Sequence, residues 1–346
     1  MPLPVAGLPA VPGPPPLSAS RASPRPPRLS VSCGFSHTLA CINGALWAFG
    51  RGSGGRLGVG TEDGSEEGDR AEPICVEDVE GAVGVSAGGL HSAAVLEDGT
   101  AAVWGFNGFG ALGLGQGVSA LSGQRSHVSK RPKLLRGPWT LVSQTVARVV
   151  CGPAHTLVLS SGGLAFACGQ AQGDGRLGVE AAAWTGQHSL PHLHQVRAST
   201  AVLPAALVAP PLPQASTVSG CPSQIVVRDP WKSPDGGDGP LVKFAALAAG
   251  HNHSVGLSTE GRVYTCGRNR DGQLGGGRVH GRHWMDPVTE GDLGDSRVVA
   301  VGAGASHSAA VTADGQLFTW GRGVEGQLGV LSPKGDVPRS CSRPAR

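Results

Sequence analysis

Five histidines in the sequence are candidates for chemistry, because each is followed by a serine or threonine at the same place in a repeated segment. They are His37, His91, His155, His253 and His307. Imidazole is a common metal ligand and a common general base. Side chains at equivalent positions of successive repeats are spread around a molecule, however, and do not converge on one metal ion. We therefore interpret them as structural, with each imidazole hydrogen-bonded to a loop or to the backbone of the neighbouring repeat.

The remaining residues do not form a convincing reactive centre. His188, His192 and His194 lie close together in sequence and suggest at most a weak metal contact. The glycine-rich segments lack the Lys-Ser/Thr pair that ends a phosphate-binding loop. No Cys-x-x-Cys pair occurs. The sequence thus predicts no catalytic residue, no cofactor and no metal, and a function that is not enzymatic.

Two sets of basic residues are candidates for contact with a partner. The first set, Lys130, Arg131 and Lys133, lies in the long connection between the second and third repeats. A protruding basic loop would contact an acidic protein or a phosphate backbone. A connection that is merely solvated is the alternative.

The second set consists of three arginines that directly follow strand-ending glycines. They are Arg51, Arg268 and Arg322. Repeats stacked in a ring would display these side chains near one rim. We therefore predict a candidate arc of contact there.

The residues around each histidine predict a β-hairpin. A short apolar strand follows the histidine, and the turns Asn43-Gly44, Asp98-Gly99 and Asp314-Gly315 each offer two positions for positive φ. The returning strand alternates large and small side chains and ends in glycine 13 or 14 residues after the histidine. Each hairpin therefore has a bulky face, which it buries only by stacking on a neighbour.

A glycine-rich loop follows each hairpin and closes on Leu-Gly. The glycine inside the loop recurs in all five copies, which indicates a backbone with positive φ or a close approach, and the leucine is expected to fill the groove between sheets. The glycines are Gly55, Gly110, Gly175, Gly272 and Gly326, and the leucines are Leu57, Leu112, Leu177, Leu274 and Leu328. Four strands per repeat of this length predict an all-β protein, a β-propeller of four-stranded antiparallel blades.

Composition sets the boundaries of the domains. Residues 1–30 contain ten prolines and no acid, and predict a disordered tail, with an organellar transit segment as the alternative. Residues 31–180 hold repeats one to three, and residues 241–335 hold repeats four and five. Residues 181–240 are expected to form a Pro/Gly-rich insertion or a degenerate blade, and residues 336–346 a disordered tail.

The cysteines predict a reducing, intracellular compartment. Cys33 and Cys151 stand where other repeats have alanine, and Cys168 and Cys266 stand where others have an aromatic residue. They therefore behave as apolar side chains rather than as a disulfide framework. We expect the cytoplasm or nucleus, with the mitochondrion or chloroplast as the alternative. No apolar run reaches the roughly 18 residues that span a bilayer, so no membrane partner is expected.

Together these motifs resemble the regulator of chromosome condensation repeat family. The best copies are Ala303–Ser308, Asp314–Gly321 and Gly326–Gly329, and the resemblance covers roughly residues 31–331 apart from the insertion. It implies a propeller of seven blades, whereas five repeats are legible in this chain. The ring would then be open, closed with five blades or completed by another chain, and open blade faces would favour self-association.

Two functions follow from the sequence. The first is a non-enzymatic scaffold whose propeller loops bind another protein. The second, which the resemblance implies, is guanine-nucleotide exchange on a small GTPase. Light sensing similar to that of the plant ultraviolet-B photoreceptor is rejected, because segments such as Gly34–Thr38 lack its tryptophan and arginine. Nucleic acid or chromatin is not an expected partner, since the net charge is only +3.

Overall fold

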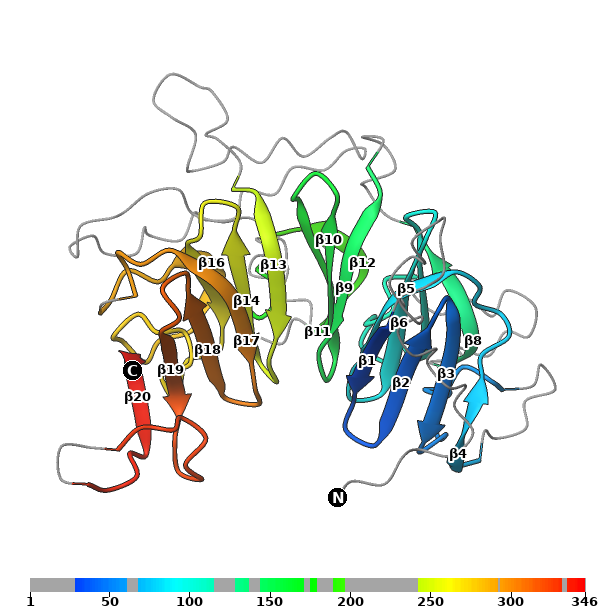
Figure 1. Ribbon diagram of the computed structural model, residues 1–346, viewed down its shortest axis with the longest axis horizontal. Helices are drawn as coiled ribbons and strands as arrows, with labels where there is room; N and C mark the ends of the chain where they lie inside the picture. Colours follow the sequence, from blue (N-terminus) through cyan, green and yellow to red (C-terminus); the bar gives the residue numbers. More distant parts are fainter. Residues whose placement is uncertain are drawn as a thin grey trace, which may run out of the picture.

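Five four-stranded antiparallel sheets make up the described part of the chain (Figure 1). The computed structural model describes residues 29–60, 68–114, 128–136, 144–170, 175–178, 189–196, 242–291, 293–331 and 335–345. Strands follow one another across each sheet in chain order. Blade 1 contains β1 (Leu29–Cys33), β2 (His37–Ile42), β3 (Ala45–Gly50) and β4 (Arg70–Cys75). Blade 2 contains β5 (Ala82–Ala87), β6 (His91–Leu96), β7 (Ala101–Phe106) and β8 (Val128–Leu135).

The other three sheets have the same order. Blade 3 contains β9 (Val146–Cys151), β10 (His155–Ser160), β11 (Ala165–Gln170) and β12 (Ser189–Gln195). Blade 4 contains β13 (Phe244–Ala249), β14 (His253–Ser258), β15 (Val263–Gly267) and β16 (Arg282–Pro287). Blade 5 contains β17 (Val298–Ala303), β18 (His307–Thr312), β19 (Leu317–Arg322) and β20 (Ser340–Ala345). The predicted β-propeller of four-stranded blades is confirmed.

The repeat histidine and the strand-ending glycine face each other in every hairpin. His37 pairs with Gly50, for example, and His253 with Gly267. Gly50 has a φ of 105°, and a Cβ there would lie 2.6 Å from the carbonyl oxygen of Ser36. Only glycine fits both the positive φ and the close approach. The pairing register with the fourth strand shifts at this glycine, which lets the outer strand bend away.

The predicted turns are only partly correct. Asn43 and Gly44 both have positive φ, at 51° and 92°, as a type I′ turn requires. At Asp98-Gly99 and Asp314-Gly315 only the glycine does. The Asp98 carboxylate instead accepts hydrogen bonds from the backbone N–H and the hydroxyl of Thr100. This side-chain cap holds the aspartate outside the left-handed region.

The core consists of four apolar layers, one between each pair of successive blades. In blades 2 to 5 the bulky face predicted for the returning strand packs against the preceding blade. Trp104 and Trp320 are fully buried in this way, in the layers between blades 1 and 2 and between blades 4 and 5. Three loop leucines, Leu57, Leu112 and Leu177, lie in these layers as predicted, and Leu274 is buried as well.

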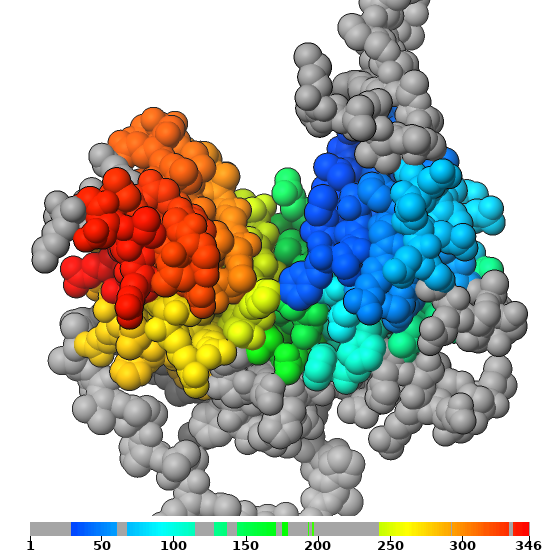
Figure 2. All heavy atoms as spheres, turned by 90° about the horizontal axis from the view of Figure 1, so that it is seen from below, coloured from blue at the N-terminus to red at the C-terminus, as the bar shows by residue number. Residues whose placement is uncertain are grey.

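The five blades form an open ring. Inner strands pack in succession, β1 on β5, β5 on β9, β9 on β13 and β13 on β17. Among the described residues no comparable packing joins blade 5 to blade 1. Figure 2 shows the first blade (blue) and the fifth (red and orange) on opposite sides of a gap. Each of these two blades therefore has one face that no other blade covers.

The structure corrects three assignments made from the sequence. Residues 336–346 are not a disordered tail, because Ser340–Ala345 forms β20 and pairs with β19. The segment 181–240 is not wholly an insertion, because Ser189–Gln195 is the outer strand of blade 3. Residues 199–240, like residues 1–28, lie outside the described residues. Lys130, Arg131 and Lys133 belong to the outer strand β8 rather than to a protruding loop.

The outer strands escaped prediction because they lack a repeated pattern. All five contain a proline, which removes a backbone donor and is tolerated at a sheet edge. The prolines are Pro73, Pro132, Pro191, Pro287 and Pro344. Such a residue also limits edge-to-edge pairing between molecules.

Candidate functional site

Four of the five histidines belong to hydrogen-bond relays that join neighbouring blades. In each relay the imidazole Nε2 of one blade bonds to the serine or threonine hydroxyl that follows the histidine of the next blade. The hydroxyl then donates to a loop carbonyl of the first blade. The Nε2–Oγ distances are 2.8 Å for His37–Ser92, 2.8 Å for His91–Thr156, 3.3 Å for His155–Ser254 and 3.0 Å for His253–Ser308.

The carbonyls that end these relays precede the loop leucines. Ser92 donates to Arg56 over 2.7 Å, Thr156 to Ala111 over 2.6 Å, Ser254 to Arg176 over 2.6 Å and Ser308 to Gln273 over 2.9 Å. Each carbonyl also faces a second donor from the same neighbouring blade. The indole N–H of Trp104, for instance, donates to Arg56 over 3.0 Å.

The relay and the burial of the ring together fix the protonation state of the histidines. Because the hydroxyl proton goes to the loop carbonyl, the hydroxyl oxygen accepts from Nε2–H, which places a proton on Nε2. The Nδ1 atoms of His37, His91, His155 and His253 are buried and have no hydrogen-bond partner. Burial lowers the pKa of His37, His91 and His253 to about 4. These histidines are therefore a neutral framework, and the predicted backbone partner is replaced by a side-chain hydroxyl.

The loop glycines fit the same junctions. All five internal loop glycines have positive φ, between 71° and 81°, as predicted. The glycine that follows the loop leucine touches the next blade. A Cβ on Gly58 would lie 2.8 Å from the Trp104 indole nitrogen, and one on Gly275 would lie 2.9 Å from that of Trp320. A Cβ on Gly329 of the fifth blade meets nothing within 4 Å.

The relay series ends at the gap. On blade 5, His307 and the Gln327 carbonyl occupy the positions that His253 and the Gln273 carbonyl have on blade 4, where both bind the hydroxyl of the next blade. Thr38 of blade 1 occupies the position of Ser92 and Thr156, but within the described residues its hydroxyl meets only Cys33 Sγ, at 4.0 Å. Burial lowers the pKa of His307 too, but the side chain is only half-buried.

The loops that follow the third strands form one rim of the propeller, which we call the loop rim. Arg51, Arg268 and Arg322 occupy equivalent positions on it, because each donates its backbone N–H to the residue before a repeat histidine. Arg51 and Arg322 are exposed, and Arg268 is half-buried. Arg51 bonds to Ser53 at 3.0 Å, and Arg322 forms an ion pair with Glu325 at 2.8 Å. The three guanidinium groups thus lie on separate blades and do not converge on one point.

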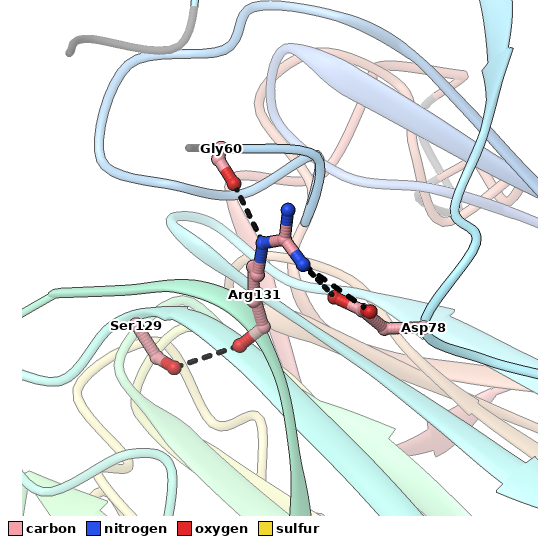
Figure 3. A network of polar contacts seen from close by, with 4 residues as sticks. All are labelled: Gly60, Asp78, Ser129 and Arg131. Carbon is pink, nitrogen blue, oxygen red and sulfur yellow. Dashed lines mark hydrogen bonds and ion pairs between the residues drawn. The ribbon is translucent and has the colours of Figure 1, made fainter. Parts of the chain in front are cut away.

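The other basic set has a structural contact that the sequence did not reveal. Arg131 donates to the Gly60 carbonyl at 2.9 Å and forms an ion pair with Asp78 at 3.3 Å (Figure 3). Gly60 belongs to the first blade's loop, and Asp78 to the link between blades 1 and 2. Arg131 therefore joins the two blades, whereas Lys133 is exposed and Lys130 half-buried on the same strand.

An aromatic contact joins blade 1 to blade 4, which are not neighbours in the ring. Phe35 of blade 1 and His251 of blade 4 have ring centroids 5.1 Å apart. Both residues follow the glycine that begins the histidine motif, so they meet near the axis at the loop rim. Sequence reasoning missed this pair because its members come from repeats that are not neighbours in the chain.

The described residues contain no group of three or more His, Cys, Asp or Glu side chains placed to hold a metal. His188 lies outside the described residues, and His192 and His194 belong to β12. Gly84–Gly88 spells Gly-x-Ser-x-Gly, the pattern of a hydrolase nucleophile turn. Ser86 lies within strand β5 and accepts a hydrogen bond from the Cys151 N–H, so it is not such a turn. No helix in the described ranges is long and apolar enough to cross a membrane.

Sequence profiles of the regulator of chromosome condensation (RCC1) repeat match most of the blades. One profile matches residues 43–95, 98–159, 260–311 and 314–346. A second matches residues 82–111, 244–273 and 298–327.

Proteins with similar sequences match the chain over more than four fifths of its length. The RCC1 domain-containing protein RUG3, mitochondrial, of Arabidopsis thaliana is 30% identical over 88% of this chain and 67% of its own length. The secretion-regulating guanine nucleotide exchange factor of Mus musculus is 30% identical over 82% of this chain and 61% of its own length. Human WBSCR16 has a similar fold, with a TM-score of 0.65 and 20% identity over 91% of this chain and 66% of that one.

Proposed function

The chain belongs to the regulator of chromosome condensation (RCC1) repeat family, and we propose that it is a non-enzymatic scaffold that binds another protein through its loop rim. The observation that carries this proposal is the difference between the rim and the relays. Equivalent relay positions carry the same chemistry in blade after blade. Equivalent rim positions carry Arg51, Phe106, Gln170, Arg268 and Arg322. A rigid frame with variable loops is suited to recognition.

Charge reversal at the rim tests this proposal. The triple variant Arg51→Glu, Arg268→Glu and Arg322→Glu is expected to lose protein partners that the wild type retains after cross-linking and affinity capture. The matched control is Arg262→Glu, an exposed arginine in the β14–β15 turn at the opposite end of blade 4. Identical partner sets for the triple variant and the wild type would rule out the rim as the binding surface.

A second candidate function is guanine-nucleotide exchange on a small GTPase. The observation that favours it is the similarity to the secretion-regulating guanine nucleotide exchange factor. Exchange needs no covalent chemistry, only a surface that displaces bound nucleotide. The expected result is faster release of labelled GDP from one member of a GTPase panel, and slower release with the triple rim variant. Unchanged release across the panel would remove this function while leaving the scaffold proposal intact.

We also propose that the protein acts in a reducing intracellular compartment. Four described cysteines, Cys41, Cys151, Cys168 and Cys266, are buried among apolar side chains. The similarity to a relative named mitochondrial favours the organelle alternative. Imaging of the fluorescently tagged full chain distinguishes the mitochondrion or chloroplast from the cytoplasm and nucleus.

A further inference from the structure

The two faces that border the gap carry the two halves of one blade junction. On blade 5, His307 Nε2 and the Gln327 carbonyl occupy the positions that receive a hydroxyl in the four existing junctions. On blade 1, Thr38 occupies the position that supplies it. The polar groups of the two faces are therefore complementary. They match the junction between blades 4 and 5, where the Ser308 hydroxyl bonds to both His253 and the Gln273 carbonyl.

The apolar groups around this polar pair match as well. Leu317 on the blade 5 face is 56% exposed, whereas the equivalent Val263 of blade 4 is 3% exposed beneath blade 5. On the blade 1 face, Val31 is 71% exposed, and its equivalent Val149 in blade 3 is 8% exposed. Cys33, beside Val31, is exposed, while its equivalent Cys151 is buried. Exposed apolar residues that continue an internal packing layer indicate an interaction surface.

We infer that the blade 5 face of one copy binds the blade 1 face of a second copy of this chain. His307 Nε2–H would donate to the partner copy's threonine hydroxyl, and that hydroxyl to the Gln327 carbonyl. A second copy is the occupant we favour because the chain itself carries both surfaces. The four internal junctions already show that they fit.

This contact is heterologous, because two different surfaces meet. Heterologous contacts either close into rings or continue as open chains of molecules. Blade 1 already lies close to blade 4 near the axis, where Phe35 meets His251, so a second copy fits only if it is displaced along the axis. Repetition of the contact would then give longer assemblies rather than a closed dimer. The two surfaces meet at the loop after β19, which carries Gln327, but Leu317 and Val31 lie on strands outside the loop rim, so variants at these two positions test self-association alone.

Two variants that each block one face make the inference testable. Leu317→Asp places a charge on the blade 5 face, and Val31→Asp places one on the blade 1 face; both residues are exposed, so the fold is retained. Leu134→Asp on β8, 55% exposed and remote from the gap, is the matched control. Sedimentation of the full chain over a range of concentrations measures the mass, and circular dichroism checks the fold.

The wild type and Leu134→Asp are expected to exceed the monomer mass of 34.9 kDa as concentration rises. Each single-face variant is expected to remain monomeric. An equimolar mixture of Leu317→Asp and Val31→Asp should form a dimer of limited size, because each variant supplies the face that the other lacks. A wild type that is monomeric throughout, a single variant that still assembles, or a mixture that does not would overturn the inference. None of these outcomes bears on the rim, which has its own test.

Discussion

The repeat residues of this chain act in pairs across blades rather than as reactive groups. A histidine, a hydroxyl and a loop carbonyl meet at each junction, where the Nε2–H, the hydroxyl and the carbonyl are paired while the histidine Nδ1 finds no partner among the described residues. Removing the hydroxyl would leave the imidazole N–H buried without a partner and the carbonyl with only its second donor. A buried group without a partner typically costs about 1–3 kcal/mol of stability.

Thr156→Val tests the relay with little change of shape. We expect it to lower the free energy of unfolding by about 1–3 kcal/mol, since the His91 Nε2–H loses its partner and the Ala111 carbonyl keeps only the weak donor Cys168 Sγ, at 3.4 Å. Thr38→Val is the matched control, because Thr38 has no such partners among the described residues. It should cost less than about 0.5 kcal/mol, the typical limit for a surface change. Urea unfolding at low protein concentration measures both, and equal costs would contradict the relay.

The histidines also predict how stability depends on pH. Their pKa in the folded chain is lowered from 6.5 to about 4 for His37, His91 and His253. Between these values the unfolded chain binds protons that the folded chain does not. The free energy of unfolding should therefore fall as pH decreases from about 6.5 towards about 4, and this contribution is fully present above about 6.5.

Urea unfolding at about pH 7.5 and about pH 5 checks this dependence. The variant His253→Asn removes one titrating group and should show a smaller loss between the two conditions than the wild type. Equal stability at both pH values would mean that the histidines are not buried as neutral groups.

At the scale of elements, the repeated hairpins and loops could be predicted from the sequence, whereas the outer strands, which share no repeated pattern, could not. Hairpins, loop glycines and loop leucines recur in five copies, so aligning the copies exposed them. Outer strands such as β12 and β20 share only a proline, and their sequences read as insertion or tail. The turn at Asp98 shows a further limit, because its conformation depends on the hydroxyl of Thr100 and not on the Asp-Gly pair alone.

The loop glycines provide an element-scale prediction. Gly275 and Gly329 have nearly the same φ, 71° and 65°, so a Gly→Ala change strains both equally. In addition, a methyl group at Gly275 would press on Trp320 of the next blade, whereas Gly329 faces open space. Gly275→Ala should therefore be the more destabilising by about 1–3 kcal/mol, the usual range for overpacking. Thermal or urea unfolding of the monomer compares them, and equal losses would indicate that the Gly329 loop is also covered.

At the scale of the whole molecule, the sequence predicted a propeller with too few blades and left its closure undecided. Closure depends on packing between segments far apart in the chain, which a repeat pattern does not encode. The rim arginines were placed on one rim by the spacing alone. Their separation on different blades and the role of Arg131 as a link between blades needed the structure.

The open ring depends most directly on one feature, the uncovered face of blade 1 in a single chain. Cys33 and Cys151 occupy equivalent positions, and only Cys33 is exposed. The direct measurement is thiol labelling of the monomeric Leu317→Asp variant with a maleimide, read out for each cysteine by peptide mass spectrometry. The open ring predicts rapid labelling of Cys33 and protection of Cys151 until the chain is unfolded. Equal protection of the two thiols in the folded monomer would contradict it.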